Sequence, residues 1–173
     1  TRDGRVQALR SPLVSTVRWL EFGDDGKVLA AAAEDGTIMA WDLESRAPLI
    51  APLQGTGRGM ARVRVIGNQL HAAGDNTVRT WTLPPMGPYG AVAVPAAAQV
   101  RSRRHIQVAG FDVHPASRLL VAGGLDGVVS LWRLPPPVLL PVRAAPLPPG
   151  HIAFDGERIV AVDGAQVQLR EPF

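Results

Sequence analysis

The chain has 173 residues, of which 46% are hydrophobic and 19% are charged, and this balance excludes an intrinsically disordered protein. No apolar run approaches the ~18 residues that a membrane-spanning helix needs, and no cysteine is available for disulfide or thiolate chemistry. The formal net charge of +3 is too small to demand a nucleic-acid partner although the pI is about 10.5, so binding of nucleic acid or phosphate is only a minor alternative.

The first clear elements are three short strands separated by turns. Residues 17–33 predict two of these strands, an alternating one and an apolar one rich in alanine. Residues 34–42 begin with an Asp-Gly turn, which favours a tight hairpin. The strand after this turn alternates, with Ile38 and Ala40 on one face and Trp41 on the other, and period two is typical of a strand.

The same succession of strand, turn, strand, turn and strand recurs three times along the chain. In the first three copies a turn aspartate precedes a tryptophan by six residues. The pairs are Asp35 and Trp41, Asp75 and Trp81, and Asp126 and Trp132. The fourth copy, residues 151–171, is weaker. In this copy Asp163-Gly164 either forms the turn itself or lies one residue before it. We prefer the second register because it places Val167 and Leu169 on the side that faces the core.

Residues 22–42, which end in the pair Trp41-Asp42, closely resemble a WD repeat. This resemblance implies an all-β fold, a β-propeller of WD-repeat type with four-stranded antiparallel blades. It also implies that an N-terminal strand within residues 3–9 completes the last blade. The tryptophan spacings are 40 and 51, against a usual repeat of ~40–45. The sequence departs from the family because only the first repeat keeps Asp after Trp, and no Gly-His pair precedes an inner strand at its usual place.

The whole chain, 1–173, is expected to form one propeller portion. Its predicted parts are an outer strand of the closing blade (1–16), blade 1 (17–55), blade 2 with a Pro- and Ala-rich insertion (56–100), blade 3 (101–145) and three strands of blade 4 (146–173). Four blades are fewer than the seven or eight that the resemblance implies. The chain is therefore a fragment of a larger propeller, half of an eight-bladed ring made by two copies, or a solitary four-bladed ring. We favour association with a copy or a parent chain, because a half-ring leaves apolar faces bare.

Catalytic and metal-binding patterns are missing from the sequence, so we expect no enzyme, no cofactor and no metal site. Of the four histidines, His71 is expected to be a buried structural residue and His114 a turn residue. An enzyme that used the central channel would need partners for Glu21 and Asp112, and none is evident. The repeat residues are interpreted as structural. They are Asp35, Trp41, Asp42, Asp75, Trp81, Asp126 and Trp132.

The candidate partner-binding residues lie at predicted hairpin turns and connections between blades. They are Arg58, Arg62, Arg103, Arg104, Glu34, Asn76 and Trp19. Trp19 is on an inner strand and faces either the next blade or a partner. The cluster at 101–105 is either a solvated loop or a site for phosphate or an acidic protein.

These patterns favour a non-catalytic protein–protein interaction scaffold, the recognition or regulatory part of a larger cytoplasmic, bacterial protein. The alternative is a self-assembling half-propeller that dimerises into an eight-bladed ring. The expected partner is a protein or the other blades of the same propeller, with no membrane involved.

Overall fold

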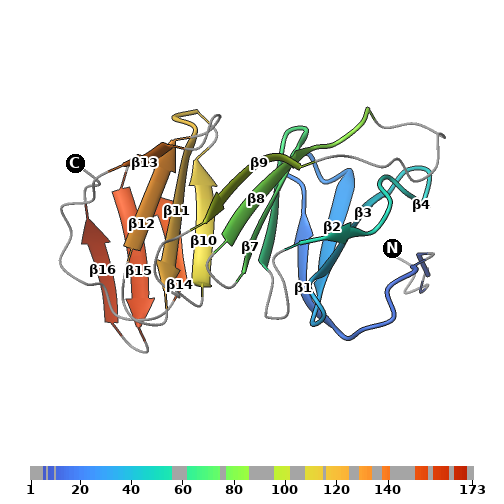
Figure 1. Cartoon of the computed structure of the whole chain (residues 1–173), viewed down its shortest axis with the longest axis horizontal. Helices are drawn as coiled ribbons and strands as arrows, with labels where there is room; N and C mark the ends of the chain where they lie inside the picture. Colours follow the sequence, from blue (N-terminus) through green and yellow to red (C-terminus); the bar gives the residue numbers. More distant parts are fainter. Residues whose placement is uncertain are drawn as a thin grey trace.

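The computed structural model describes residues 6, 8–9, 11–55, 62–74, 77–85, 96–101, 108–114, 116–124, 129–133, 138–140, 151–155, 158–163 and 166–170. All regular elements in these ranges are β-strands, which form four antiparallel sheets that follow one another in chain order (Figure 1). The all-β prediction is therefore confirmed.

Each sheet is a meander in which neighbouring strands pair in chain order, with one exception in the first sheet. The first sheet contains β1 (Val17–Phe22), β2 (Val28–Ala33), β3 (Thr37–Asp42), β4 (Ala47–Pro48) and β5 (Leu53–Gln54), and β5 pairs with β3 and not with β4. The second contains β6 (Arg62–Ile66), β7 (Gln69–Gly74), β8 (Thr77–Thr82) and β9 (Ala96–Arg101). The third contains β10 (Val108–His114), β11 (Leu119–Gly124), β12 (Val129–Arg133) and β13 (Val138–Leu140). The fourth contains β14 (His151–Asp155), β15 (Arg158–Asp163) and β16 (Gln166–Arg170).

The register within the sheets repeats, which makes positions in different sheets equivalent. A leucine of the second strand lies opposite the tryptophan of the third in the pairs Leu29 with Trp41, Leu70 with Trp81, and Leu120 with Trp132. In the fourth sheet the corresponding pair is Ile159 with Arg170. Because side chains alternate between the faces of a strand, this register also determines which residues of each sheet face the preceding sheet and which face the following one.

The core lies between the sheets. At the first boundary Trp81 packs in one cluster with Ala30, Ala32 and Ala40, whose small side chains leave room for the indole. Trp132 packs in the same way at the second boundary, in a cluster with Ala73 and Val78 of the preceding sheet. A third cluster joins Val121 and Leu131 to Ile152 and Ile159. The tryptophans and the alternating residues of the third strands thus face opposite sides, as the alternation predicted.

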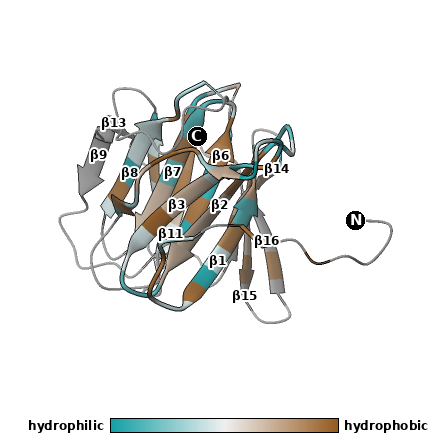
Figure 2. Cartoon of the chain, turned by 90° about the vertical axis from the view of Figure 1, so that its right-hand side faces the viewer, coloured by the Kyte–Doolittle hydropathy of each residue, from teal (hydrophilic) through white to brown (hydrophobic). Residues whose placement is uncertain are grey.

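The first and fourth sheets differ from the two sheets that lie between them. The first sheet and the fourth sheet lie at opposite ends in Figure 1, and Figure 2 looks onto the first sheet, where β1, β2 and β3 carry hydrophobic segments. The fourth sheet has three strands, and the described part of residues 1–16 forms no strand. Leu9 and Leu13 pack instead against Ala31, Met39 and Trp41 of the first sheet. Of the segment 3–9 that was predicted to complete the last sheet, residues 3–5 and 7 lie outside the described residues, and Val6, Ala8 and Leu9 form no strand.

Val167 is a correction to the sequence analysis. The pairing of Val162 with Val167 and of Val160 with Leu169 puts Val167 on the face that points away from the third sheet. Its side chain is 63% exposed, so the prediction that it faces the core was wrong for this copy. The cause is positional, since no other sheet among the described residues packs on this face of the fourth sheet.

Candidate functional site

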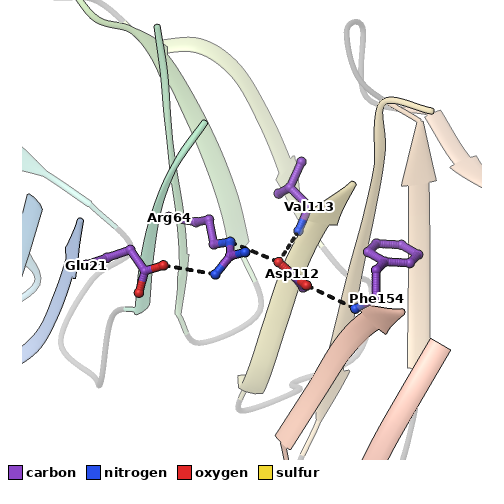
Figure 3. A network of polar contacts seen from close by, with 5 residues as sticks. All are labelled: Glu21, Arg64, Asp112, Val113 and Phe154. Carbon is purple, nitrogen blue, oxygen red and sulfur yellow. Dashed lines mark hydrogen bonds and ion pairs between the residues drawn. The ribbon is translucent and has the colours of Figure 1, made fainter. Parts of the chain in front are cut away.

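A line of polar contacts crosses all four sheets along their first strands (Figure 3). Arg64 on β6 donates a 2.9 Å hydrogen bond from Nη1 to Oε1 of Glu21 on β1. Its Nε lies 2.9 Å from Oδ1 of Asp112 on β10. The other oxygen of Asp112 accepts a 3.0 Å hydrogen bond from the backbone N–H of Phe154 on β14. Four consecutive sheets are therefore joined through three side chains.

Glu21, Arg64 and Asp112 occupy the same position in their sheets, opposite Ala30, His71 and Val121 respectively. The sequence analysis found no partner for Glu21 or Asp112 and missed Arg64, which pairs with both. The link could have been found from the sequence, because the side chain at this equivalent position is acidic in the first sheet, basic in the second and acidic in the third. Since each carboxylate is engaged in an ion pair, the arrangement supports a structural role and offers no free general acid or base.

The candidate residues Trp19 and Arg62 meet at the boundary between the first two sheets. The guanidinium carbon of Arg62 lies 4.4 Å from the centroid of the Trp19 ring, which is a cation–π distance. Trp19 is partly buried and packs against the first core cluster, so it faces the next sheet. Burial lowers the pKa of Arg62 from its usual value. Nε1 of Trp19 and Nε of Arg62 are buried, and neither has a hydrogen-bond acceptor among the residues that the structure describes.

Other polar contacts surround this pair on the side of the hairpin between β2 and β3. Arg18 and Glu34 form a 3.0 Å ion pair, with both side chains about half exposed. Nη1 of Arg79 donates a 2.7 Å hydrogen bond to the backbone oxygen of Gln54. We call the surface formed by these residues the hairpin face. It comprises Arg18, Trp19, Glu34, Gln54, Arg62 and Arg79.

Several predicted site residues lie outside the described residues. They are Arg58, Asn76, Arg103 and Arg104 among the partner-binding candidates, and Asp75 and Asp126 among the repeat residues. Of the cluster at 101–105 the structure describes only Arg101, which pairs with Thr77 at the end of β9. The prediction that this cluster binds an acidic group therefore stays untested.

Two repeat aspartates hydrogen-bond nearby backbone groups. Oδ1 of Asp35 accepts a 2.9 Å hydrogen bond from the N–H of Thr37, and contacts with Thr37 lower the pKa of Asp35. Asp42 accepts hydrogen bonds of 2.9 Å from the backbone of Glu44 and from the hydroxyl of Ser45. Both carboxylates thus stabilise turns, which is how Asp commonly acts at such positions.

The two histidines singled out from the sequence also have local partners. Buried His71 lies with Nδ1 3.0 Å from the hydroxyl of Thr80, and burial lowers its pKa to about 4. Nδ1 of His114 lies 2.7 Å from the hydroxyl of Ser117 in the turn after β10. Within the described ranges, no group of three or more His, Asp or Glu side chains could hold a metal ion.

The described part of the chain contains no helix long and apolar enough to cross a membrane.

Comparison with known proteins identifies the repeat and the fold. The family model described as "WD domain, G-beta repeat" matches residues 5–42 and 100–133. No curated protein matches the chain in sequence. Among solved structures, the computationally designed Ika4 protein has a TM-score of 0.73 and 20% identity, covering 95% of each chain.

Two further solved structures are longer than this chain, and the matched part of this chain covers about half of each. The β-propeller domain of Myceliophteria thermophila Cps50 (Swd1) has a TM-score of 0.70 and 15% identity, covering 84% of this chain and 49% of that one. The computationally designed Ika8 protein has a TM-score of 0.71 and 19% identity, with coverage of 90% and 45%. At these identities the likeness shows the fold, and the chain spans about half the length of both.

Proposed function

Because the chain belongs to the WD-repeat β-propeller family, we propose that it is a non-catalytic protein-interaction scaffold that binds an acidic segment of its partner on the hairpin face. It would act in the cytoplasm as the recognition part of a larger, regulatory bacterial protein. The match of the repeat model and the half-length coverage of a natural propeller domain support this proposal.

The single observation that carries the proposal is the stacking of Arg62 on Trp19. Tryptophan and arginine are the side chains most enriched among residues that dominate binding energy at protein interfaces. Packing against the first core cluster holds Trp19 in place, and the indole in turn orients the Arg62 guanidinium. A pre-organised cation loses little conformational entropy on binding.

The chemistry of the hairpin face favours a carboxylate ligand. Arginine carries five N–H donors and no acceptor, so it suits carboxylates that bind in a bidentate way. Against a catalytic role stand the ion pairs of Glu21 and Asp112, which engage the inner-strand carboxylates.

A phage-displayed library of random peptides tests the proposal. We expect the wild-type chain to enrich acidic peptides, and Arg62→Gln to weaken the binding of a selected peptide at least about tenfold, or about 1.4 kcal/mol. Arg158→Gln is the matched control, because Arg158 is an exposed arginine of the fourth sheet, paired with Asp155, outside the hairpin face. Equal binding by wild type and Arg62→Gln, or no enrichment of acidic peptides, would contradict the proposal.

A further inference from the structure

Within the described part of the chain, the first and last sheets each have a face that no other sheet covers. On β1, Leu20 and Phe22 are 58% and 62% exposed, whereas the equivalent Val63 and Val65 of the second sheet are 1% and 3% exposed. On β16, Val167 is 63% exposed, and the equivalent Ile38 of the first sheet is fully buried. The two bare surfaces thus consist of positions that are core elsewhere in the same chain.

We call this surface of the first sheet the leading face and that of the fourth sheet the trailing face. The leading face comprises Leu20, Phe22 and Leu29, together with Ala31, Met39 and Trp41, which are buried beneath Leu9 and Leu13. The trailing face comprises Ala153, Val160, Val162 and Val167. At every boundary inside the chain, residues equivalent to the trailing face contact residues equivalent to the leading face. The two ends therefore fit each other as the internal sheets do.

Leu9 and Leu13 in the N-terminal segment lie where the outer edge of a preceding sheet would lie. At the first boundary, outer-edge residues Leu49, Ile50 and Leu53 share a cluster with Trp81. On the leading face, Leu9 and Leu13 pack in a cluster with Trp41, which is equivalent to Trp81. Meanwhile β16 pairs with β15 alone among the described strands, whereas β3, β8 and β12 each have an outer neighbour.

We propose that the leading face of one copy docks on the trailing face of a second copy, so that two chains close a ring of eight sheets. The N-terminal segment of each copy then extends β16 of the other as its outer strand. This is strand addition at a sheet edge, which satisfies backbone groups that are otherwise unpaired. The inference goes beyond the proposed hairpin-face function and does not depend on it.

Three observations select a second copy as the occupant. Both complementary faces belong to the same chain, so one head-to-tail contact repeats twice and closes if each copy covers half a turn. In the comparison with the designed Ika8 protein, 90% of this chain covers 45% of that one, which is the share expected of half a ring. The first and fourth sheets lie at opposite ends of the molecule, so the leading and trailing faces of a single copy do not meet (Figure 1).

Light scattering coupled to size exclusion tests the inference on the 173-residue chain. We expect twice the chain mass of 18.4 kDa, and we expect Phe22→Glu and Val167→Glu each to give a monomer, because each buries a charge in the contact. Ala116→Glu, at an exposed turn outside both faces, is the matched control and keeps the dimer. Both test residues are exposed in a single copy, so circular dichroism should show folded variants.

A wild-type monomer would overturn the inference, as would assemblies larger than two, which indicate open head-to-tail growth in place of a closed ring. A dimer that survives both substitutions would place the contact elsewhere and would also overturn it. Loss of peptide binding in Arg62→Gln with the dimer intact leaves this inference standing, so the two proposals fail separately.

Discussion

Arg64 and Asp112 form a 2.9 Å ion pair across the boundary between the second and third sheets. The pair links β6 of the second sheet to β10 of the third sheet, two strands that belong to different repeats. The Asp112 side chain is only 11% exposed, and it also accepts backbone hydrogen bonds from Val113 and Phe154. The ion pair therefore sets the position of the third and fourth sheets relative to the second.

Removal of Arg64 should destabilise the chain more than removal of an exposed arginine. In Arg64→Met, Asp112 keeps its charge in a nearly buried place without its cation, and we expect a loss of about 1–2 kcal/mol after allowing for the partial exposure of Arg64. Arg18→Met, which breaks the exposed pair with Glu34, should cost less than about 0.5 kcal/mol. Urea unfolding measures the free energy of unfolding of both variants. Equal losses would show that the contacts of Arg64 stabilise the chain no more than an exposed ion pair does.

Gly55 has no room for a side chain. A Cβ at this position would clash with Cδ1 of Ile38 and lie 2.9 Å from the carbonyl oxygen of Gly36. We expect Gly55→Ala to cost about 2–3 kcal/mol through overpacking. Gly67→Ala is the matched control, since Gly67 has a φ of 53° but nothing near its Cβ, and should cost about 1 kcal/mol. A thermal midpoint lower for Gly67→Ala than for Gly55→Ala would refute the steric explanation.

His71 should make stability depend on pH. Burial lowers the pKa of His71 from 6.5 to about 4 in the folded chain, so the unfolded chain binds the extra proton between these values. Stability from this residue is present above pH 6.5 and is lost as the pH falls toward 4, by roughly 3 kcal/mol in total. The double variant His71→Val/Thr80→Leu, which copies the pair Val121 and Leu131 of the third sheet, should lack this component.

The free energy of unfolding is measured for wild type and the double variant at pH 7, 5.5 and 4.5. Because the other titratable groups are the same in both proteins, the change of the difference with pH reports the contribution of His71. A constant difference between the two proteins over this range would rule out His71 as the cause.

The sequence allowed the repeated strands and the faces of Ile38, Ala40 and Trp41 to be predicted, because alternation and turn residues are local signals. It did not reveal the link from Arg64 to Glu21 and Asp112. That link depends on how first strands from different sheets align, with Arg64 lying 43 residues after Glu21 and 48 residues before Asp112, and no local pattern encodes it. The position of Leu9 was missed for the same reason, since the segment lies against the first sheet and not on the last one.

Disulfide trapping tests the central claim, that the two end faces repeat the internal contacts. At the third boundary a Cβ on Gly123 would lie 3.6 Å from Cβ of Ile152, within the range of about 3.5–4.5 Å for disulfides. By register Val162 is equivalent to Gly123, and Leu20 is equivalent to Ile152. The chain has no cysteine of its own, so introduced pairs are unambiguous.

The measurement is non-reducing gel electrophoresis of Leu20→Cys/Val162→Cys after mild oxidation. Gly123→Cys/Ile152→Cys is the positive control for a bond within one chain, followed by loss of free thiols, and Leu20→Cys/Ala116→Cys is the mismatched control. We predict a covalent dimer for Leu20→Cys/Val162→Cys and none for the mismatched pair. A monomer with free thiols, in a preparation where the positive control forms its bond, would contradict the head-to-tail contact.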